Sequence, residues 1–111
     1  MKLLFTALTL ACGLMTASFA NAAIDDDAAQ AILKKGGCGS CHKLDKAGAG
    51  PSIKDMAKKH KGQADAADKM KTAVRDGSKG AYGADSAMPG FPAAKISDPD
   101  LTSLVQWIMT K

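Results

Sequence analysis

The 111-residue sequence is poor in several residue types, and some of these shortages exclude a class of protein. It has three cysteines, two histidines and 5% aromatic residues. With so few cysteines the chain cannot be a disulfide-rich scaffold. The net charge is only +4, and the sequence has no run of basic residues interleaved with aromatic residues. Both observations argue against a nucleic-acid partner. Glutamate is missing altogether, an absence that excludes no function.

Long apolar runs are also missing, except near the N-terminus. Lys2, the apolar residues 3–14 and the tripeptide Ala20-Asn21-Ala22 have the pattern of a secretory signal peptide. The apolar run is too short to span a membrane as a helix. We therefore predict a cleaved signal peptide at residues 1–22, export to the periplasm and one small domain at residues 23–111. A lipoprotein signal with Cys12 as the lipidated residue is the alternative.

The most informative stretch is the pentapeptide Cys38-Gly39-Ser40-Cys41-His42. Two cysteines three residues apart, followed directly by histidine, form the attachment pattern of a c-type haem. Residues at i, i+3 and i+4 share one face of a helical turn, so both thiols and the imidazole can reach one porphyrin. The motif predicts thioether bonds from Cys38 and Cys41 and an iron ligand at His42.

Three other interpretations of the motif are less favourable. A thioredoxin-like redox pair would follow a strand, whereas residues 25–35 have a helical pattern. A disulfide closing so short a loop would add little stability. A zinc site needs four ligands, and beyond the motif the domain offers only His60.

The rest of the domain predicts helices and no strands. Helical apolar spacing and start signals predict four helices, over residues 25–35, after Pro51 up to Gly62, from Asp65 to Gly77, and from Ser97 towards the C-terminus. Ser52 and Ser97, each with aspartate three residues later, resemble capping boxes. On the last helix Trp107 is expected to flank the apolar face. The predicted fold class is all-α, with about four helices around one haem.

A loop without periodicity is predicted at residues 78–96, and a loop this long in a small domain is usually functional. It contains Met88, directly before Pro89. The haem iron of a His/Met cytochrome needs a thioether opposite the histidine. Met56 and Met70 fall on apolar helical faces, where methionine is usually core filler. By elimination, Met88 is the predicted sixth ligand.

These residues together resemble the short bacterial class I cytochromes c, the cytochrome c-551/c-552 group. The resemblance covers nearly the whole domain, through residues 35–42, 50–55, 77–83, 88–89 and 106–108. It implies a compact four-helix fold around one haem, with the first and last helices crossing. It also implies His42 and Met88 on opposite sides of the iron, and a soluble periplasmic carrier of single electrons that is not an enzyme.

The resemblance further implies roles around the haem. The carbonyl of Pro51 is expected to accept a hydrogen bond from the ring of His42, and Tyr82 stands where the family usually has a tryptophan bonded to a haem propionate. A family arginine that often lies near the propionates falls on Ala73. Lys71, Arg75 and Lys79 are then the candidate partners of the propionates.

His60 has two interpretations. It stands at the i+7 position of an apolar stripe on the second helix, which favours a packed, half-buried histidine over an iron ligand or partner-binding group.

Four lysines are predicted to surround the exposed haem edge and to attract acidic redox partners. They are Lys43, Lys46, Lys79 and Lys95. The expected partners are a membrane cytochrome complex as donor and a terminal reductase or oxidase as acceptor, and a monomer is expected. Lys58 and Lys59 are placed on the polar side of the second helix, where changes should affect docking less. The alternatives are a small haem enzyme or gas sensor with a labile sixth ligand, and a haem-free module.

Overall fold

The computed structural model describes residues 23–111, and the predicted signal peptide at residues 1–22 lies outside the described residues. The order of elements is α1 (Asp26–Gly36), α2 (Ile53–His60), α3 (Ala66–Asp76), β1 (Ser78–Lys79), β2 (Ala87–Met88) and α4 (Asp98–Ile108). All four predicted helices are present within a residue or two of their expected bounds. Within this described part, no helix is long and apolar enough to cross a membrane.

The helix starts follow from their capping residues. The side chains of Asp25, Ser52 and Ser97 accept hydrogen bonds from backbone N–H groups three residues later. Each of these bonds satisfies a donor that would otherwise have no partner inside its helix. The capping boxes expected at Ser52 and Ser97 are thus confirmed as N-caps.

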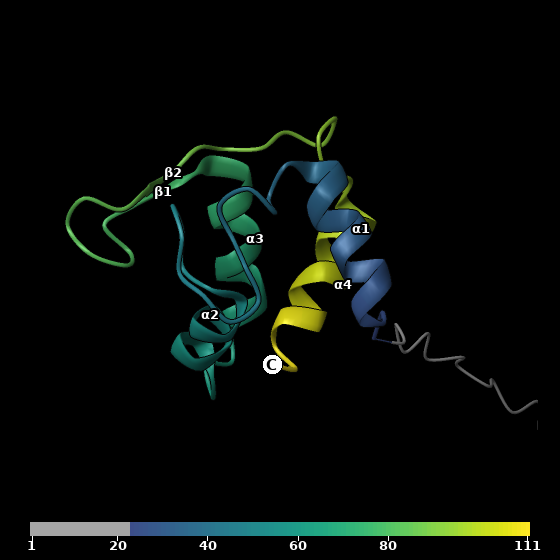
Figure 1. Cartoon of the computed structure of the whole chain (residues 1–111), viewed down its shortest axis with the longest axis horizontal. Coiled ribbons are helices and arrows are strands. Elements are labelled where there is room, and N and C mark those ends of the chain that lie inside the picture. The colour runs from purple at the N-terminus through teal and green to yellow at the C-terminus, as the bar shows by residue number, and fades with distance from the viewer. Residues whose placement is uncertain (1–22) are drawn as a thin grey trace, which may run out of the picture.

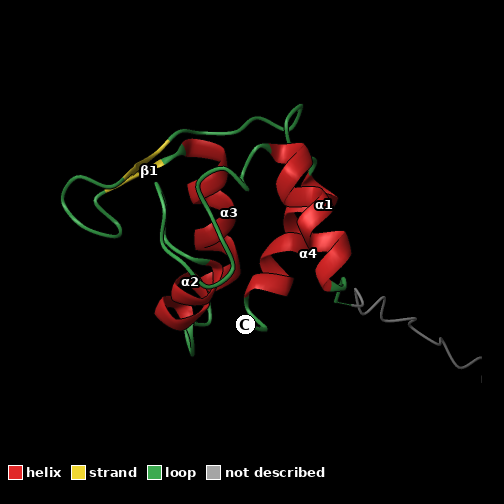
Figure 2. Cartoon of the chain, viewed as in Figure 1, coloured by secondary structure: helices red, strands yellow, loops and turns green. Residues whose placement is uncertain are grey.

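Helix α4 is the centre of the fold and packs against each of the other three helices. Figures 1 and 2 show α1 beside α4 on one side of the molecule and α2 with α3 on the other. Its sequence explains the position, because apolar residues occur on more than one face of the helix. The buried residues of α4 are Leu101, Leu104, Val105, Trp107 and Ile108.

Trp107 lies deeper than the sequence indicated, with 2% of its surface exposed. Its indole Nε1–H donates a hydrogen bond to Asp26 Oδ1 at 2.8 Å, and the Lys111 ammonium pairs with the same carboxylate. These bonds connect the start of α1 to the end of α4. The expected flanking position for Trp107 is therefore wrong, because a partner on α1 allows the indole to be buried.

The segment between α3 and α4 contains a short ribbon where the sequence predicted only loop. β1 and β2 are antiparallel, with Ser78 opposite Met88 and Lys79 opposite Ala87. Two residues per strand are too few to produce an alternating pattern, so periodicity could not reveal them. After the ribbon, the chain runs on to α4 and makes a turn at residues 92–95 shortly before the helix begins (Figure 2).

Candidate functional site

The cysteine–histidine motif forms a helical turn directly after α1. The Cys38 N–H donates to Leu33 O at 2.8 Å, and the N–H groups of Cys41 and His42 donate back to Cys38 O at 3.2 and 3.0 Å. Cys38 is buried, Cys41 is exposed, and neither forms a disulfide. The turn therefore has the local geometry that the spacing predicted.

Cys38 does not have the lowered pKa that is typical of an attacking redox thiol. Burial raises the pKa of the Cys38 thiol, and the neighbouring Cys41 raises it further. Reactive dithiols have a lowered pKa on the attacking sulfur. Among residues 23–111, no three His, Cys or Asp side chains form a cluster that could hold a metal ion.

The ring of His42 is held in a defined tautomer. Its Nδ1 lies 2.8 Å from the carbonyl oxygen of Pro51, which can only accept, so the Nδ1–H donates and Nε2 keeps its lone pair. The loop backbone can approach the ring because residue 50 is glycine. A Cβ at Gly50 would lie 2.7 Å from His42 Cε1, closer than real Cβ contacts. The Pro51 contact implied by the family resemblance is therefore present in the structure.

A cavity of about 580 Å³ lies beside this motif, and every helix contributes to its wall. It brings together six of the predicted site residues, namely Cys38, Cys41, His42, Pro51, Tyr82 and Met88. The wall is mostly apolar and includes core residues such as Leu101 and Val105. Shape and lining suit a large, flat, mainly apolar group.

Met88 reaches the cavity from β2 and is half-buried. Its backbone passes close to the end of α3, where Gly77 has φ of +85° and a Cβ would lie 2.7 Å from Met88 O. Only glycine accepts both the left-handed backbone and this close approach. Met56 and Met70 also line the cavity, although Met70 belongs to the buried core as expected.

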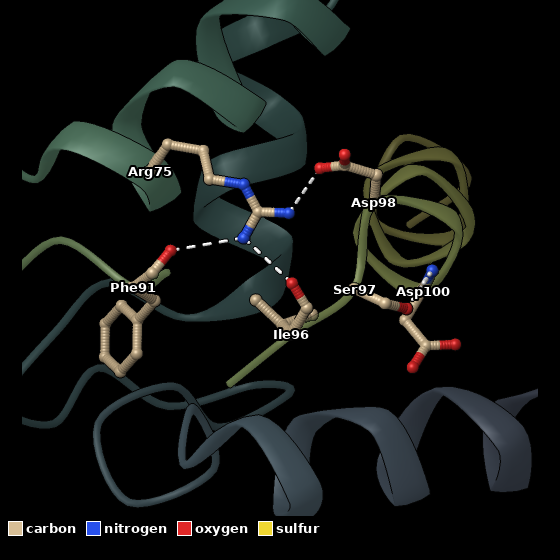
Figure 3. A network of polar contacts seen from close by, with 6 residues as sticks. All are labelled: Arg75, Phe91, Ile96, Ser97, Asp98 and Asp100. Carbon is tan, nitrogen blue, oxygen red and sulfur yellow. Dashed lines mark hydrogen bonds and ion pairs between the residues drawn. The ribbon is translucent and has the colours of Figure 1, made fainter. Parts of the chain in front are cut away.

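Arg75 fastens the chain that follows Met88. Its guanidinium donates to Phe91 O at 3.1 Å and Ile96 O at 2.8 Å, and it pairs with Asp98 at 2.5 Å (Figure 3). The Phe91 N–H in turn donates to Val74 O at 2.7 Å. One side chain of α3 thus holds both ends of residues 91–96 and the first turn of α4.

Because Arg75 is bound in this way, the set of residues expected to pair with the haem propionates changes. None of the three candidates, Lys71, Arg75 and Lys79, lines the cavity, and Arg75 is bound elsewhere. The lysines that do line it are Lys59 and Lys69, which sequence reasoning missed. Periodicity places a long side chain on a helix face but does not tell which neighbour its flexible end reaches.

Lys59 lies over Tyr82 at the cavity, with its Nζ 4.1 Å from the ring centroid, and it donates to the backbone oxygen of Ala81. Burial raises the pKa of Tyr82, and the charge of Asp55 raises it further, so the phenol keeps its proton. Lys59 is exposed, as expected for the polar side of α2, and it also lines the cavity. Lys43 donates to Gly39 O at 2.8 Å, while Lys46, Lys79 and Lys95 are exposed, and none of the four lines the cavity.

His60 is half-buried and lines the cavity, as the packed interpretation predicted. Its Nδ1 is buried, and within the described chain it has no hydrogen-bond partner. Buried polar atoms in folded proteins nearly always have partners, so this atom fits a cavity that receives a group with polar atoms of its own. The apolar wall, the free Nε2 of His42 and this nitrogen together fit a haem.

Comparison with known proteins agrees with this geometry. The family model described as cytochrome c oxidase, cbb3-type, subunit III matches residues 18–108. A cytochrome c2 of Rubrivivax gelatinosus is 45% identical over 78 residues, which cover 70% of this chain and 91% of that protein.

Two solved structures are also similar. The crystal structure of Nitrosomonas europaea cytochrome c552 has a TM-score of 0.65 and 34% identity, covering 73% of this chain and 96% of that one. The class 1 cytochrome MtoD of Sideroxydans lithotrophicus has a TM-score of 0.64 and 33% identity, covering 79% of this chain and 97% of that one.

Proposed function

This chain belongs to the cytochrome c family, with one covalent haem c and the class I fold, and we propose that it is a soluble periplasmic one-electron carrier between respiratory redox proteins. A general electron-carrier role follows from the family. The periplasmic location rests on the signal-peptide pattern of residues 1–22. The proposed donor is a membrane cytochrome complex, and the proposed acceptor is a terminal reductase or oxidase.

One observation carries the proposal: His42 and Met88 line the same cavity as the two cysteines of the motif. Cys38 and Cys41 would tether the haem through thioether bonds, and His42 Nε2 and the Met88 thioether would bind its iron. When bound, the haem supplies an iron that takes up and releases one electron at a potential raised by methionine.

The surrounding residues assist this role without taking part in bond chemistry. The Pro51 carbonyl orients the His42 ring, fixes its tautomer and increases its donor strength. The mostly apolar wall would limit the access of water to His42 and Met88 once the haem is bound. With both His42 and Met88 bound to the iron, no position would be left for a substrate. This separates a carrier from the alternative, a small haem enzyme or gas sensor.

The test uses the intact protein, expressed with a cytochrome c maturation system. We expect haem to stay with the polypeptide through denaturing electrophoresis, and Cys38→Ala combined with Cys41→Ala to lose it. Spectra of the oxidised and reduced protein should show a six-coordinate haem that does not react with added small ligands. Haem that separates on denaturation would contradict the covalent assignment, and an open iron would favour the enzyme or sensor.

A further inference from the structure

The cavity has a cationic corner. The only formally charged side chains that line it at neutral pH, among residues 23–111, are Lys59 on α2 and Lys69 on α3. No aspartate lines it. His60, whose buried Nδ1 has no partner within the described chain, lies beside Lys59 in the sequence and on the same wall. An otherwise apolar cavity with this lining suits a ligand that carries negative groups at one edge.

Gln63 connects these residues into one unit. Its side-chain Nε2 donates to Lys59 O at 3.0 Å, and its Oε1 accepts from Lys69 Nζ at 3.3 Å. Its backbone N–H donates to His60 O at 3.1 Å. The turn between α2 and α3 therefore holds the backbone of Lys59 and His60 close to the Lys69 ammonium, while the Lys59 ammonium reaches Ala81 and Tyr82 on the same cavity wall.

The present partners of the lysines can be exchanged. Lys69 pairs with Asp65 at 3.2 Å, but both side chains are more than half exposed, and exposed pairs contribute little. Lys59 donates to a neutral carbonyl and lies on the Tyr82 ring. A carboxylate at this corner would offer each ammonium a stronger, charge-assisted bond.

From this arrangement we infer that Lys59, His60 and Lys69 form the site for the carboxylate groups of the haem, its propionates. The inference rests on the proposed function. The carboxylates of a haem lie on the edge away from its vinyl groups, so attachment at the cysteines leaves the carboxylates to another part of the wall. Position 73, which also lines the cavity, is alanine and has no side-chain donor to offer.

Other titratable groups near this corner must be distinguished from the proposed site when the potential is measured against pH. Those lining the cavity are Tyr82, His42 and the two cysteines. Asp55 acts on Tyr82 from α2, and Asp65 and Asp68 surround Lys69 and Lys71 on α3. Lys58, next to Lys59 but exposed and outside the cavity wall, is the matched control.

The test is the midpoint potential of the haem protein, measured against pH for the wild type, Lys59→Gln, Lys69→Gln and Lys58→Gln. A nearby cation favours the charged form of a carboxylate and lowers its pKa. We expect the pH at which the potential changes to rise in Lys59→Gln and Lys69→Gln, and to rise further in the double variant. Lys58→Gln should follow the wild type, and His60→Phe should move the transition more than His60→Gln.

Haem content and circular dichroism show whether each variant is folded. If His60→Phe does not fold, the potential curve of Lys59→Gln still tests the site, because Lys59 is exposed. Potential curves for Lys59→Gln and Lys69→Gln that coincide with that of Lys58→Gln would overturn the site while leaving the electron carrier intact. Loss of covalent haem in the wild type would instead contradict the proposed function.

Discussion

Among single residues, the contact between His42 and Pro51 has the most direct chemical consequence. A proton fixed on Nδ1 leaves Nε2 as the only ring nitrogen able to bind iron. Glycine at position 50 allows this contact, because the Cβ of any other residue there would clash with the imidazole of His42. His42 and the carbonyl that orients it are thus nine residues apart in the chain but act as one group.

Met88→Ala tests the second axial side chain. We expect the weak sulfur-to-iron band near the red end of the oxidised spectrum to disappear and added ligands to bind the iron. The potential should fall by a noticeable part of the ~0.8 V range that axial ligands cover. Because Met56 and Met70 line the same cavity, Met56→Ala and Met70→Ala are the controls. If the band survives in Met88→Ala and is lost in either control, another methionine is the ligand.

Residue patterns predicted the motif turn and the helix caps because both depend on neighbours in the sequence. They did not predict the role of Arg75, whose partners lie 16 to 23 residues away and include two backbone oxygens. Backbone acceptors carry no sequence signal. The contacts of Lys59 with Ala81 and Tyr82 were not predicted for a similar reason, since the tertiary fold brings these residues together.

Between elements, Arg75 connects α3 to the chain that carries Met88. Arg75→Gln should lower the free energy of unfolding by about 2 kcal/mol, the usual contribution of a hydrogen-bonded charged group. In Arg75→Gln we also expect the Met88 thioether to leave the iron at a lower denaturant concentration than that at which the helices unfold. Following the sulfur-to-iron band and the helical circular dichroism in one urea titration checks both points.

Arg75→Lys is the matched control. Its ammonium keeps the charge but lacks the planar fork that reaches Phe91 O and Asp98 together, so it should restore only part of the lost stability. If the band and the helical signal of Arg75→Gln disappear together, Arg75 supports the whole domain and has no special effect on Met88.

The link between α1 and α4 predicts a dependence of stability on pH. Hydrogen bonds from Lys111 and then Trp107 lower the pKa of Asp26 below its ordinary value of 3.8. A carboxylate with a lowered folded-state pKa stabilises the protein above its unfolded pKa. This contribution is lost as the pH falls through the folded-state pKa. Asp26→Asn should therefore destabilise the protein near neutral pH and have little effect in strong acid.

Denaturant unfolding at about pH 7 and about pH 2 measures this difference. Asp27→Asn is the control, since Asp27 lies in the same helical turn but, within the described chain, is not bonded to Trp107 or Lys111. Equal effects of the two substitutions would mean that the helix dipole, and not the link to α4, accounts for the change.

For the whole molecule, surface charge should control the encounter with partners. Reversing the charges of Lys43 and Lys79 should slow electron exchange with an acidic partner by about tenfold at low salt, the lower end of electrostatic steering. The effect should shrink as salt rises, because exposed charges are screened beyond about 10 Å at 0.1 M ionic strength. Stopped-flow rates over a salt series provide the measurement.

Lys34 and Lys58, both exposed and outside the cavity wall, are the control pair for this experiment. Lys59 is unsuitable, since it lines the cavity. Rates that fall equally in the control pair would show that net charge governs recognition. Rates that do not change with salt would exclude electrostatic steering altogether.

The ion pair between Asp26 and Lys111 also brings the two ends of the described domain to one corner. Adjacent ends permit circular permutation, in which the old ends are joined and new ones opened in an exposed turn. Joining Lys111 to Ala23 through a short linker and opening the chain at the exposed Gly83 would move Met88 ahead of the cysteine motif. The cavity is formed by segments that meet in space, so the rearranged protein should still enclose its cofactor. The fold would then not require the cysteine–histidine motif to precede Met88 in the chain.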